Sequence, residues 1–281
     1  MPRPSPRDAS THAAPCLEPR CRSVTIATPI KQRALLGTSK GNFQCYLTEE
    51  KELTAHDFRR LADSEAYRMP QKVQDNEDLV ERAFWSSLTG DAHGTAFFGA
   101  ERISRGRAGP RGVPLRPAAR TPRHVVLSAL AVNPPIYGAD TPQSFFDEKI
   151  PWGWNLRNLS GDLLRKARLP EVVGVTTPMT YWGMWRAFFS WHVEDKDLYS
   201  INYLHFGAPK MWYCIPPSAR HKFEEVCQNL FPENFEQCPA FLRHKNIMLS
   251  PAQLRQWSIP YVTAKQRPGE FIVLNSGAYH W

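Results

Sequence analysis

The chain has 281 residues, of which 42% are hydrophobic and 22% are charged, and its formal net charge is +8. This length supplies enough material for one barrel core with accessory helices. Because no run of 18 apolar residues occurs and the N-terminus lacks an apolar stretch, we expect neither a membrane-spanning helix nor a secretory signal.

The positive charge is concentrated in two segments that lack helical or strand periodicity. Residues 1–22 carry a net charge of +2, and residues 90–124 carry seven arginines against Asp91 and Glu101. Both segments are rich in Ala, Gly, Pro and Ser, a composition typical of disorder. We therefore expect a disordered tail over residues 1–25 and, at most, weak contact of these basic arms with DNA phosphates.

Residues 26–88 predict a helical N-terminal part that packs on the barrel, with a strand-like start and two helices. One helix is expected to begin at Thr54, because Asp57 follows three residues later as in a capping box. Residues 89–131 form a low-complexity basic insertion, which is unusually long for a loop inside a compact domain. It is either a tolerated surface insertion or a translated intron, and sequencing the spliced transcript distinguishes the two.

Residues 132–281 are expected to form the catalytic domain, which contains strands and three further helices. One helix is expected within residues 151–168. A second, over residues 218–230, would place one apolar face on the core through Phe223, Val226, Cys227 and Leu230. A third would begin at Ser250-Pro251, where a capping residue precedes proline at the first helical position.

The most informative motif is His192-Val193-Glu194, followed by His280 at the end of a second strand-like region that includes residues 270–274. Residues 188–193 are aromatic and β-branched, so they predict a strand on which His192 and Glu194 share a face. Two imidazoles and one carboxylate are the ligand set of non-haem Fe(II) oxygenases. An isolated H-x-E motif, however, more often marks a surface strand.

The residues after this motif predict a β-hairpin. A strand over residues 198–206, a Gly-Ala-Pro turn and a second strand over residues 211–217 follow one another directly. Lys210 begins the second, otherwise apolar and aromatic strand. It is either a solvated charge at a sheet edge or the partner of a buried anion.

Residues 181–217 resemble the catalytic core of the Jumonji-C (JmjC) histone lysine demethylases, with greatest similarity to the lysine-specific demethylase 4 subgroup. The shared motifs are H-x-E, S-I-N-Y-L-H-F-G and P-K-x-W-Y-x-I-P-P. Residues 133–140 and 238–271 extend the likeness, and residues 30–88 are more weakly similar.

The resemblance implies a mainly β fold with accessory helices, built as the double-stranded β-helix (jelly roll) of cupin-like oxygenases. The chain stops one residue after His280, so we expect this JmjC barrel to be incomplete at its C-terminus. An unclosed barrel exposes a sheet edge and apolar surface, and we therefore expect low stability.

The resemblance also implies roles for individual residues. Fe(II) would be held by His192, Glu194 and His280. The co-substrate 2-oxoglutarate would be bound by Tyr137, Phe189, Asn202, Lys210 and Trp212, with Lys210 pairing its distal carboxylate. The methylated lysine would contact Gly174, Tyr181, Glu194 and Asp140.

Zinc is implied only in part. Cys238 and His244 match half of a structural zinc site of the subgroup, but this chain lacks the other half. A site with four ligands therefore cannot be completed, and we expect zinc only in a longer chain.

The implied reaction uses Fe(II), 2-oxoglutarate and O2 to hydroxylate an N-methyl carbon, with release of formaldehyde. The implied substrate is trimethyl- or dimethyl-lysine in the tail of histone H3, at its ninth or thirty-sixth residue, within the nucleosome and hence in the nucleus. Met179 replaces a tyrosine of the subgroup, which leaves the preferred lysine open. The alternatives are a JmjC protein hydroxylase and an inactive fragment or scaffold.

Overall fold

The structure is a computed structural model. It describes residues 21, 23–36, 41–74, 76, 79–88, 133–146, 153–159, 166–168 and 170–281. Most of the expected tail, the basic insertion and much of the helix expected within residues 151–168 lie outside the described residues. Of that helix, the described part contains a 3-10 turn, Leu156–Asn158.

Two groups of antiparallel strands enclose the core. The larger sheet has the order β6-β5-β2-β3-β9, formed by β2 (Pro29–Leu36), β3 (Asn42–Glu49), β5 (Ile136–Thr141), β6 (Thr180–Gly183) and β9 (Ile247–Leu249). The second group contains β10-β8-β12 and β11-β7, formed by β7 (Ser200–Tyr203), β8 (Lys210–Ile215), β10 (Val262–Gln266), β11 (Phe271–Leu274) and β12 (Tyr279–His280).

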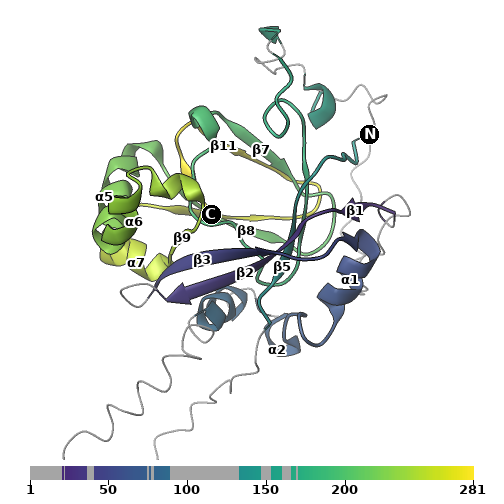
Figure 1. The fold of residues 1–281 in the computed structure, drawn as a ribbon, viewed down its shortest axis with the longest axis horizontal. Coiled ribbons are helices and arrows are strands. Elements are labelled where there is room, and N and C mark those ends of the chain that lie inside the picture. The colour runs from purple at the N-terminus through teal and green to yellow at the C-terminus, as the bar shows by residue number, and fades with distance from the viewer. Residues whose placement is uncertain are drawn as a thin grey trace, which may run out of the picture.

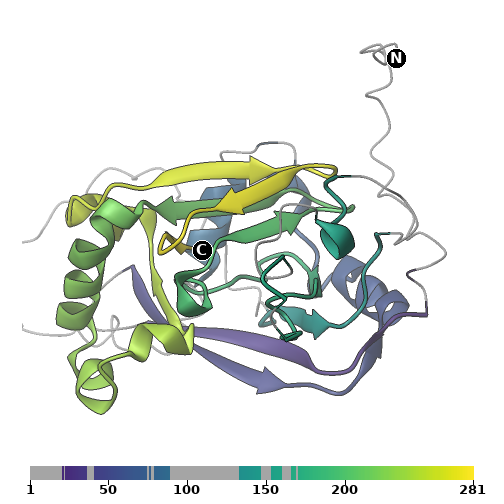
Figure 2. The ribbon, with the colours of Figure 1, turned by 90° about the horizontal axis from the view of Figure 1, so that it is seen from above.

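These two groups face each other, with β2 and β3 opposite the green and yellow strands β7, β8, β10 and β11 (Figures 1 and 2). Apart from the consecutive strands β2 and β3, most paired strands are far apart in the sequence, such as β7 with β11 and β3 with β9, as in a jelly roll. The chain therefore has the mainly β, cupin-like architecture with accessory helices that its sequence predicts.

Helices cover the ends of this half-barrel (Figure 1). Helix α1 (Ala55–Asp63) begins as predicted, because the Thr54 side chain accepts a hydrogen bond from the Asp57 backbone N–H at 3.0 Å. Helix α5 (Arg220–Leu230) buries Phe223, Val226 and Cys227, which confirms its predicted apolar face. Helix α7 (Pro251–Gln256) follows the expected N-cap Ser250. The remaining short segments are α2 (Gln71–Gln74), α6 (Pro232–Gln237), β1 (Thr25–Ile26) and β4 (Leu53–Thr54).

The N-terminal part contributes more strand than the sequence indicated. Residues 79–88 are helical, as is α1, but β2 and β3 are eight-residue strands within the main sheet. Cys21, which was assigned to the disordered tail, is completely buried and packs in a cluster that contains Ile26, Phe58 and Trp182. Its apolar contacts explain why order begins before residue 26.

The predicted hairpin of residues 198–217 is wrong. Strand β7 pairs with β11, whereas β8 lies between β10 and β12. Residues 204–209 connect the two sheets instead of forming a tight turn. This segment is too long for a two-residue hairpin loop, and Gly207 within it has a positive φ of 98°.

The strand predicted over residues 188–193 is reduced to one bridge, between His192 and His280. At the beginning of this segment, the side chain of Gln32 takes the place of the backbone hydrogen bonds of a neighbouring strand. Gln32, 5% exposed, donates to the Phe188 carbonyl at 2.6 Å and accepts from the Phe188 N–H at 3.0 Å. Both backbone polar groups of this buried residue are thereby satisfied by β2.

The largest apolar cluster supports the segment that carries the H-x-E motif. Trp191 and Val193 flank His192 and belong to the same cluster as Phe223 of α5 and Tyr279 of β12. The Trp191 indole N–H donates to the Leu249 carbonyl at 3.0 Å. Burial on both sides therefore fixes the backbone of His192 against the neighbouring strands. In the part of the chain that the structure describes, no helix has both the length and the apolarity to cross a bilayer.

Replacing Gln32 by alanine would leave both backbone polar groups of Phe188 buried without their present partners. Because each such group costs about 1–3 kcal/mol, we expect Gln32→Ala to lower the free energy of unfolding by about 3 kcal/mol in urea denaturation. The control is Gln44→Ala, which removes a half-buried amide from β3 and should cost no more than about 1 kcal/mol. Equal losses in the two variants would contradict this role of Gln32.

Candidate metal centre

Two histidines that are 88 positions apart in the sequence are joined through their backbones. The His192 N–H donates to the His280 carbonyl at 3.1 Å, and the His280 N–H donates to the His192 carbonyl at 2.9 Å. Their ring centroids lie 4.1 Å apart, and the residues are 7% and 3% exposed. The strand β12 thus brings the third predicted ligand beside the first.

Both imidazoles have one nitrogen engaged by their own backbone. The Nδ1 of His192 lies 2.8 Å from the Ser190 carbonyl, and the Nδ1 of His280 lies 3.1 Å from the Ala278 carbonyl. A carbonyl only accepts hydrogen bonds, so each Nδ1 carries the proton. The Nε2 lone pairs remain for a ligand, and the rings are held in fixed orientations as in protein metal sites.

Glu194 completes the cluster. Its carboxylate Oε1 lies 3.4 Å from the Nε2 of His280, and the ligand atoms of Glu194 and the two histidines all lie within 4.8 Å of one another. Across the described residues, no other set of three or more His, Cys, Asp or Glu side chains converges in this way. Glu194 lies outside any strand, in extended backbone just before the 3-10 turn Asp195–Asp197.

The electrostatics of the cluster suit a cation. Burial, reinforced by neighbouring His280, lowers the pKa of His192. The adjacent His280 imidazole, with its Nε2 3.4 Å from the carboxylate, holds the pKa of the Glu194 carboxyl below its usual range. A neutral His192 and an ionised Glu194 are the protonation states required of metal ligands.

The donor set itself fits Fe(II). Two imidazoles and one carboxylate form the facial triad of non-haem iron oxygenases, which leaves positions for other ligands. In the described residues, His192, Glu194 and His280 therefore form the candidate metal centre.

An aromatic wall extends from this centre. The rings of Tyr137 and Tyr181 stack with centroids 6.0 Å apart, and Phe189 packs edge-on against Tyr137 at 4.9 Å. Phe189 also lies 6.2 Å from the His192 ring. The Tyr181 hydroxyl donates to Asp140 at 2.8 Å, so four of the predicted site residues on β5, β6 and the following segment are contiguous with the metal centre.

Lys210 lies close to the rings of both Phe189 and Trp212. Its Nζ is 4.8 Å from the centroid of Phe189 and 4.3 Å from that of Trp212. Burial lowers the pKa of Lys210 to about 8, and no described carboxylate contributes to this shift. A half-buried lysine between two aromatic rings favours the interpretation as a partner for an anion over that as a solvated edge charge.

Gln266 connects Trp212 with β7 and with the residue before β11, and the sequence analysis did not single it out. It accepts from the Trp212 indole N–H at 2.9 Å and donates to the carbonyls of Asn202 at 3.2 Å and Glu270 at 3.0 Å. Gln266 is completely buried. A glutamine that faces the interior of a barrel could have been recognised as a polar residue in an apolar environment. The sequence did not predict which residues of β10 face the interior, so Gln266 was missed.

The other predicted residues are more dispersed. Asn202 is half-buried in β7, opposite Ile272. Gly174 lies in an exposed turn with a φ of +78°, where a Cβ would approach Met179 to 3.8 Å. Cys238 follows α6 and is half-buried, and His244 is exposed; among the described residues, these two have no third ligand group near them.

Comparison with known proteins agrees with this geometry. Residues 179–281 match the JmjC domain, described as a hydroxylase domain. The chain is 36% identical over 259 residues to mouse lysine-specific demethylase 4B and 35% identical over 260 residues to rat lysine-specific demethylase 4D. It is 36% identical over 259 residues to the human probable lysine-specific demethylase 4F. Each alignment covers 92% of this chain but only 20%, 42% and 33%, respectively, of the three relatives.

The burial of Lys210 predicts a cost in stability. Below pH 8 the folded state carries Lys210 as the ammonium form, and its desolvation lowers the free energy of unfolding. As the pH rises above 8, Lys210 loses its proton in the folded state before it does so in the unfolded state, so this loss of stability becomes smaller. We expect Lys210→Met to raise the free energy of unfolding at pH 7 by on the order of 2 kcal/mol, with a smaller gain at pH 9.5. Denaturant titrations at both pH values measure this difference.

The control is Lys51→Met, which removes an exposed lysine and should change stability by less than about 0.5 kcal/mol. Destabilisation of the ligand-free protein by Lys210→Met at pH 7 would be inconsistent with an uncompensated buried cation.

Proposed function

We propose that this chain, which contains a match to the JmjC domain and is 35–36% identical to lysine-specific demethylases 4B, 4D and 4F, is an Fe(II)- and 2-oxoglutarate-dependent demethylase of methylated lysine in histone H3. The observation that carries the proposal is the convergence of His192, Glu194 and His280 within 4.8 Å. The half-buried Lys210, between Phe189 and Trp212, supports the proposal because it would bind an acidic co-substrate.

His192, Glu194 and His280 would hold the iron. When bound, Fe(II) supplies the activation of dioxygen with 2-oxoglutarate as the two-electron reductant. The protein's part is to keep the two Nε2 atoms and the carboxylate unprotonated and aimed at one point, which the Nδ1 hydrogen bonds to Ser190 and Ala278 support.

Lys210 would bind the distal carboxylate of 2-oxoglutarate. A carboxylate that enters an apolar pocket needs a cation and hydrogen-bond donors, and Asn202 and Tyr137 would supply the donors. Phe189 and Trp212 would exclude water on both sides. Gln266 would fix the Trp212 ring, since it accepts the indole hydrogen bond at 2.9 Å.

The methylated lysine would lie against the polar and aromatic surface formed by Tyr181, Asp140, Gly174 and Glu194. Tyr181 is bonded to Asp140 and stacked on Tyr137. Oxygen atoms and aromatic faces suit a methylammonium group, because its carbon-bound hydrogens carry partial positive charge.

The proposed reaction balances without another reactant. One oxygen atom of dioxygen enters succinate as 2-oxoglutarate loses carbon dioxide, and the other enters the N-methyl carbon. The C–N bond then breaks, which gives formaldehyde and a lysine with one methyl group fewer. The tail of histone H3, presented in the nucleosome, would be the substrate, so the site of action would be the nucleus.

A protein hydroxylase is the second candidate, because the matched domain is described as a hydroxylase. It would use the same metal and co-substrate but modify a side-chain carbon. Its product retains the added oxygen atom and no formaldehyde is released. The two reactions therefore differ in a directly measurable product.

The test is turnover by the purified chain with Fe(II), 2-oxoglutarate and a panel of trimethyl- and dimethyl-lysine H3 peptides. We expect peptide-dependent release of formaldehyde and succinate, with the peptide losing one methyl group by mass spectrometry. His192→Ala should fall to background because it removes a metal ligand, whereas His56→Ala, which changes an exposed histidine of α1, should retain activity.

A peptide product that gains one oxygen atom without formaldehyde would favour the hydroxylase. Binding of Fe(II) and 2-oxoglutarate with no peptide-dependent turnover would favour a scaffold. Either outcome would contradict the demethylase.

A further inference from the structure

The two segments that carry the metal ligands meet a second time outside the metal centre. The chain leaves Glu194 through a tight turn in which Lys196 and Asp197 have positive φ values of 56° and 51°. It enters β12 through residues 275–278. Because left-handed backbone is unfavourable for a residue with a Cβ, two such residues in succession require contacts that hold them.

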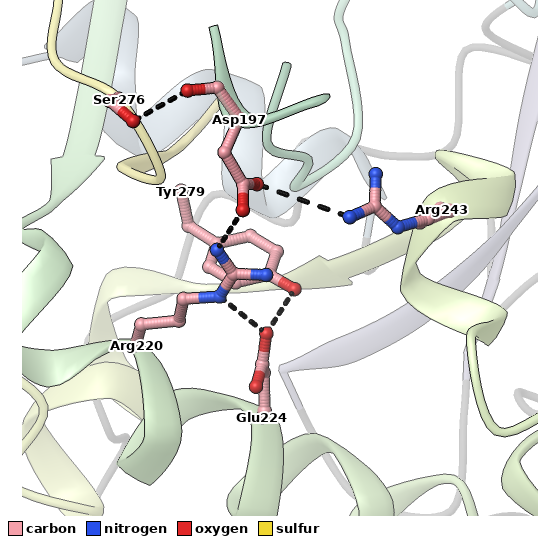
Figure 3. Close-up of polar contacts among 6 residues, drawn as sticks. All are labelled: Asp197, Arg220, Glu224, Arg243, Ser276 and Tyr279. Atoms are coloured by element: carbon pink, nitrogen blue, oxygen red, sulfur yellow. Dashed lines mark hydrogen bonds and ion pairs between the residues drawn. The ribbon is translucent and has the colours of Figure 1, made fainter. Parts of the chain in front are cut away.

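A polar network supplies these contacts (Figure 3). The Ser276 hydroxyl donates to the Asp197 carbonyl at 2.5 Å. The Asp197 carboxylate accepts from Nη1 of Arg220 at 2.9 Å, and its other oxygen lies 3.9 Å from the Arg243 guanidinium. The turn after Glu194 is therefore bound both to the turn before His280 and to α5.

Arg220 joins this turn to the residue that precedes His280. Its Nε donates to Glu224 at 2.9 Å, and the same Glu224 oxygen accepts from the Tyr279 hydroxyl at 3.0 Å. The Arg220 guanidinium also lies 5.9 Å from the centroid of the Tyr279 ring. One side chain thus connects Asp197, three residues after Glu194, with Tyr279, one residue before His280.

The position of Arg220 is itself constrained. Its helix α5 is anchored by the buried Phe223, Val226 and Cys227. The Arg220 side chain is 25% exposed and lies between two carboxylates. Gly277 allows the close approach, because a Cβ at this position would lie 3.2 Å from Nη1 of Arg220 and the residue has a φ of +69°.

The backbone bridge alone does not place Glu194. It fixes His192 against His280, but the carboxylate ligand lies two residues beyond the bridge, at the start of the strained turn. Its distance from His280 depends on where that turn is held. The network around Arg220 joins this turn to the approach to β12.

We propose that Arg220 is a positioning residue that fixes the Glu194 carboxylate relative to His280 and thereby sets the affinity of the cluster for a divalent metal ion. The inference rests on the proposed function, in which this cluster binds Fe(II). Residues that orient metal ligands typically contribute about 10–100-fold to metal affinity. Arg220 acts through the turn instead of touching a ligand, so we expect the lower end of this range.

The test is a titration of the purified chain with Co(II), followed by the visible absorption of the bound ion. We expect Arg220→Ala to raise the apparent Kd for Co(II) about tenfold and to change the absorption band shape, because the ligand geometry changes. Arg220→Lys should fall between it and wild type, since a lysine keeps the charge but cannot bridge both carboxylates as a fork.

The matched control is Arg255→Ala. Arg255 also bonds a tyrosine, with Nη1 2.7 Å from the Tyr261 hydroxyl, but it joins neither ligand segment. It should leave the Kd and the spectrum unchanged. Ser276→Ala removes a single contact of the network and should raise the Kd in the same direction by a smaller factor, which keeps the test valid should Arg220→Ala not fold.

The outcomes separate this inference from the proposed function. If wild type does not bind Co(II), the metal centre and the proposed function both fail. If wild type binds it, but Arg220→Lys and Ser276→Ala show an unchanged Kd and spectrum, the positioning role is overturned while the metal centre stands. A lower melting temperature of metal-free Arg220→Ala with wild-type Co(II) affinity would assign Arg220 to stability alone and would equally overturn it.

Discussion

The reciprocal backbone pair between His192 and His280 is the contact on which the site depends. It joins the segment that follows β6 to β12, which belongs to the second group of strands. Because backbone hydrogen bonds fix direction as well as distance, the two imidazoles are held side by side at 4.1 Å. Trp191 and Val193, buried in the apolar cluster under α5, hold this pair from behind.

The residues around this histidine pair include one cation, Lys210, that costs stability in the free protein and would bind an acidic ligand. The indole of Trp212 is bonded to Gln266, whereas Lys210 lies half-buried over the Trp212 ring, and no described carboxylate contributes to the shift of its pKa. Such a group lowers the stability of the free protein and becomes favourable when an acidic ligand binds. The Arg220 guanidinium, paired with the carboxylates of Asp197 and Glu224, connects the turn after Glu194 with α5. The candidate site is thus held by contacts with β7, β8, β12 and α5.

The sequence predicted the parts of the molecule that depend on local chemistry. The caps at Thr54 and Ser250 and the apolar face of α5 follow from spacing alone, and the H-x-E motif supplied two of the three side chains that converge in the candidate metal centre. Strand partners were not predictable in this way, because β7 and β8 are neighbours in sequence but belong to different sheets. The role of Gln32 was hidden for the same reason, since its partner Phe188 is 156 residues away.

One divalent cation should be held jointly by His192, Glu194 and His280. Anomalous diffraction from crystals grown with Mn(II) would locate this cation. We expect a single strong peak about 2 Å from the Nε2 atoms of both histidines and from a Glu194 carboxylate oxygen. A peak elsewhere, or one bonded to only one of the three side chains, would contradict it.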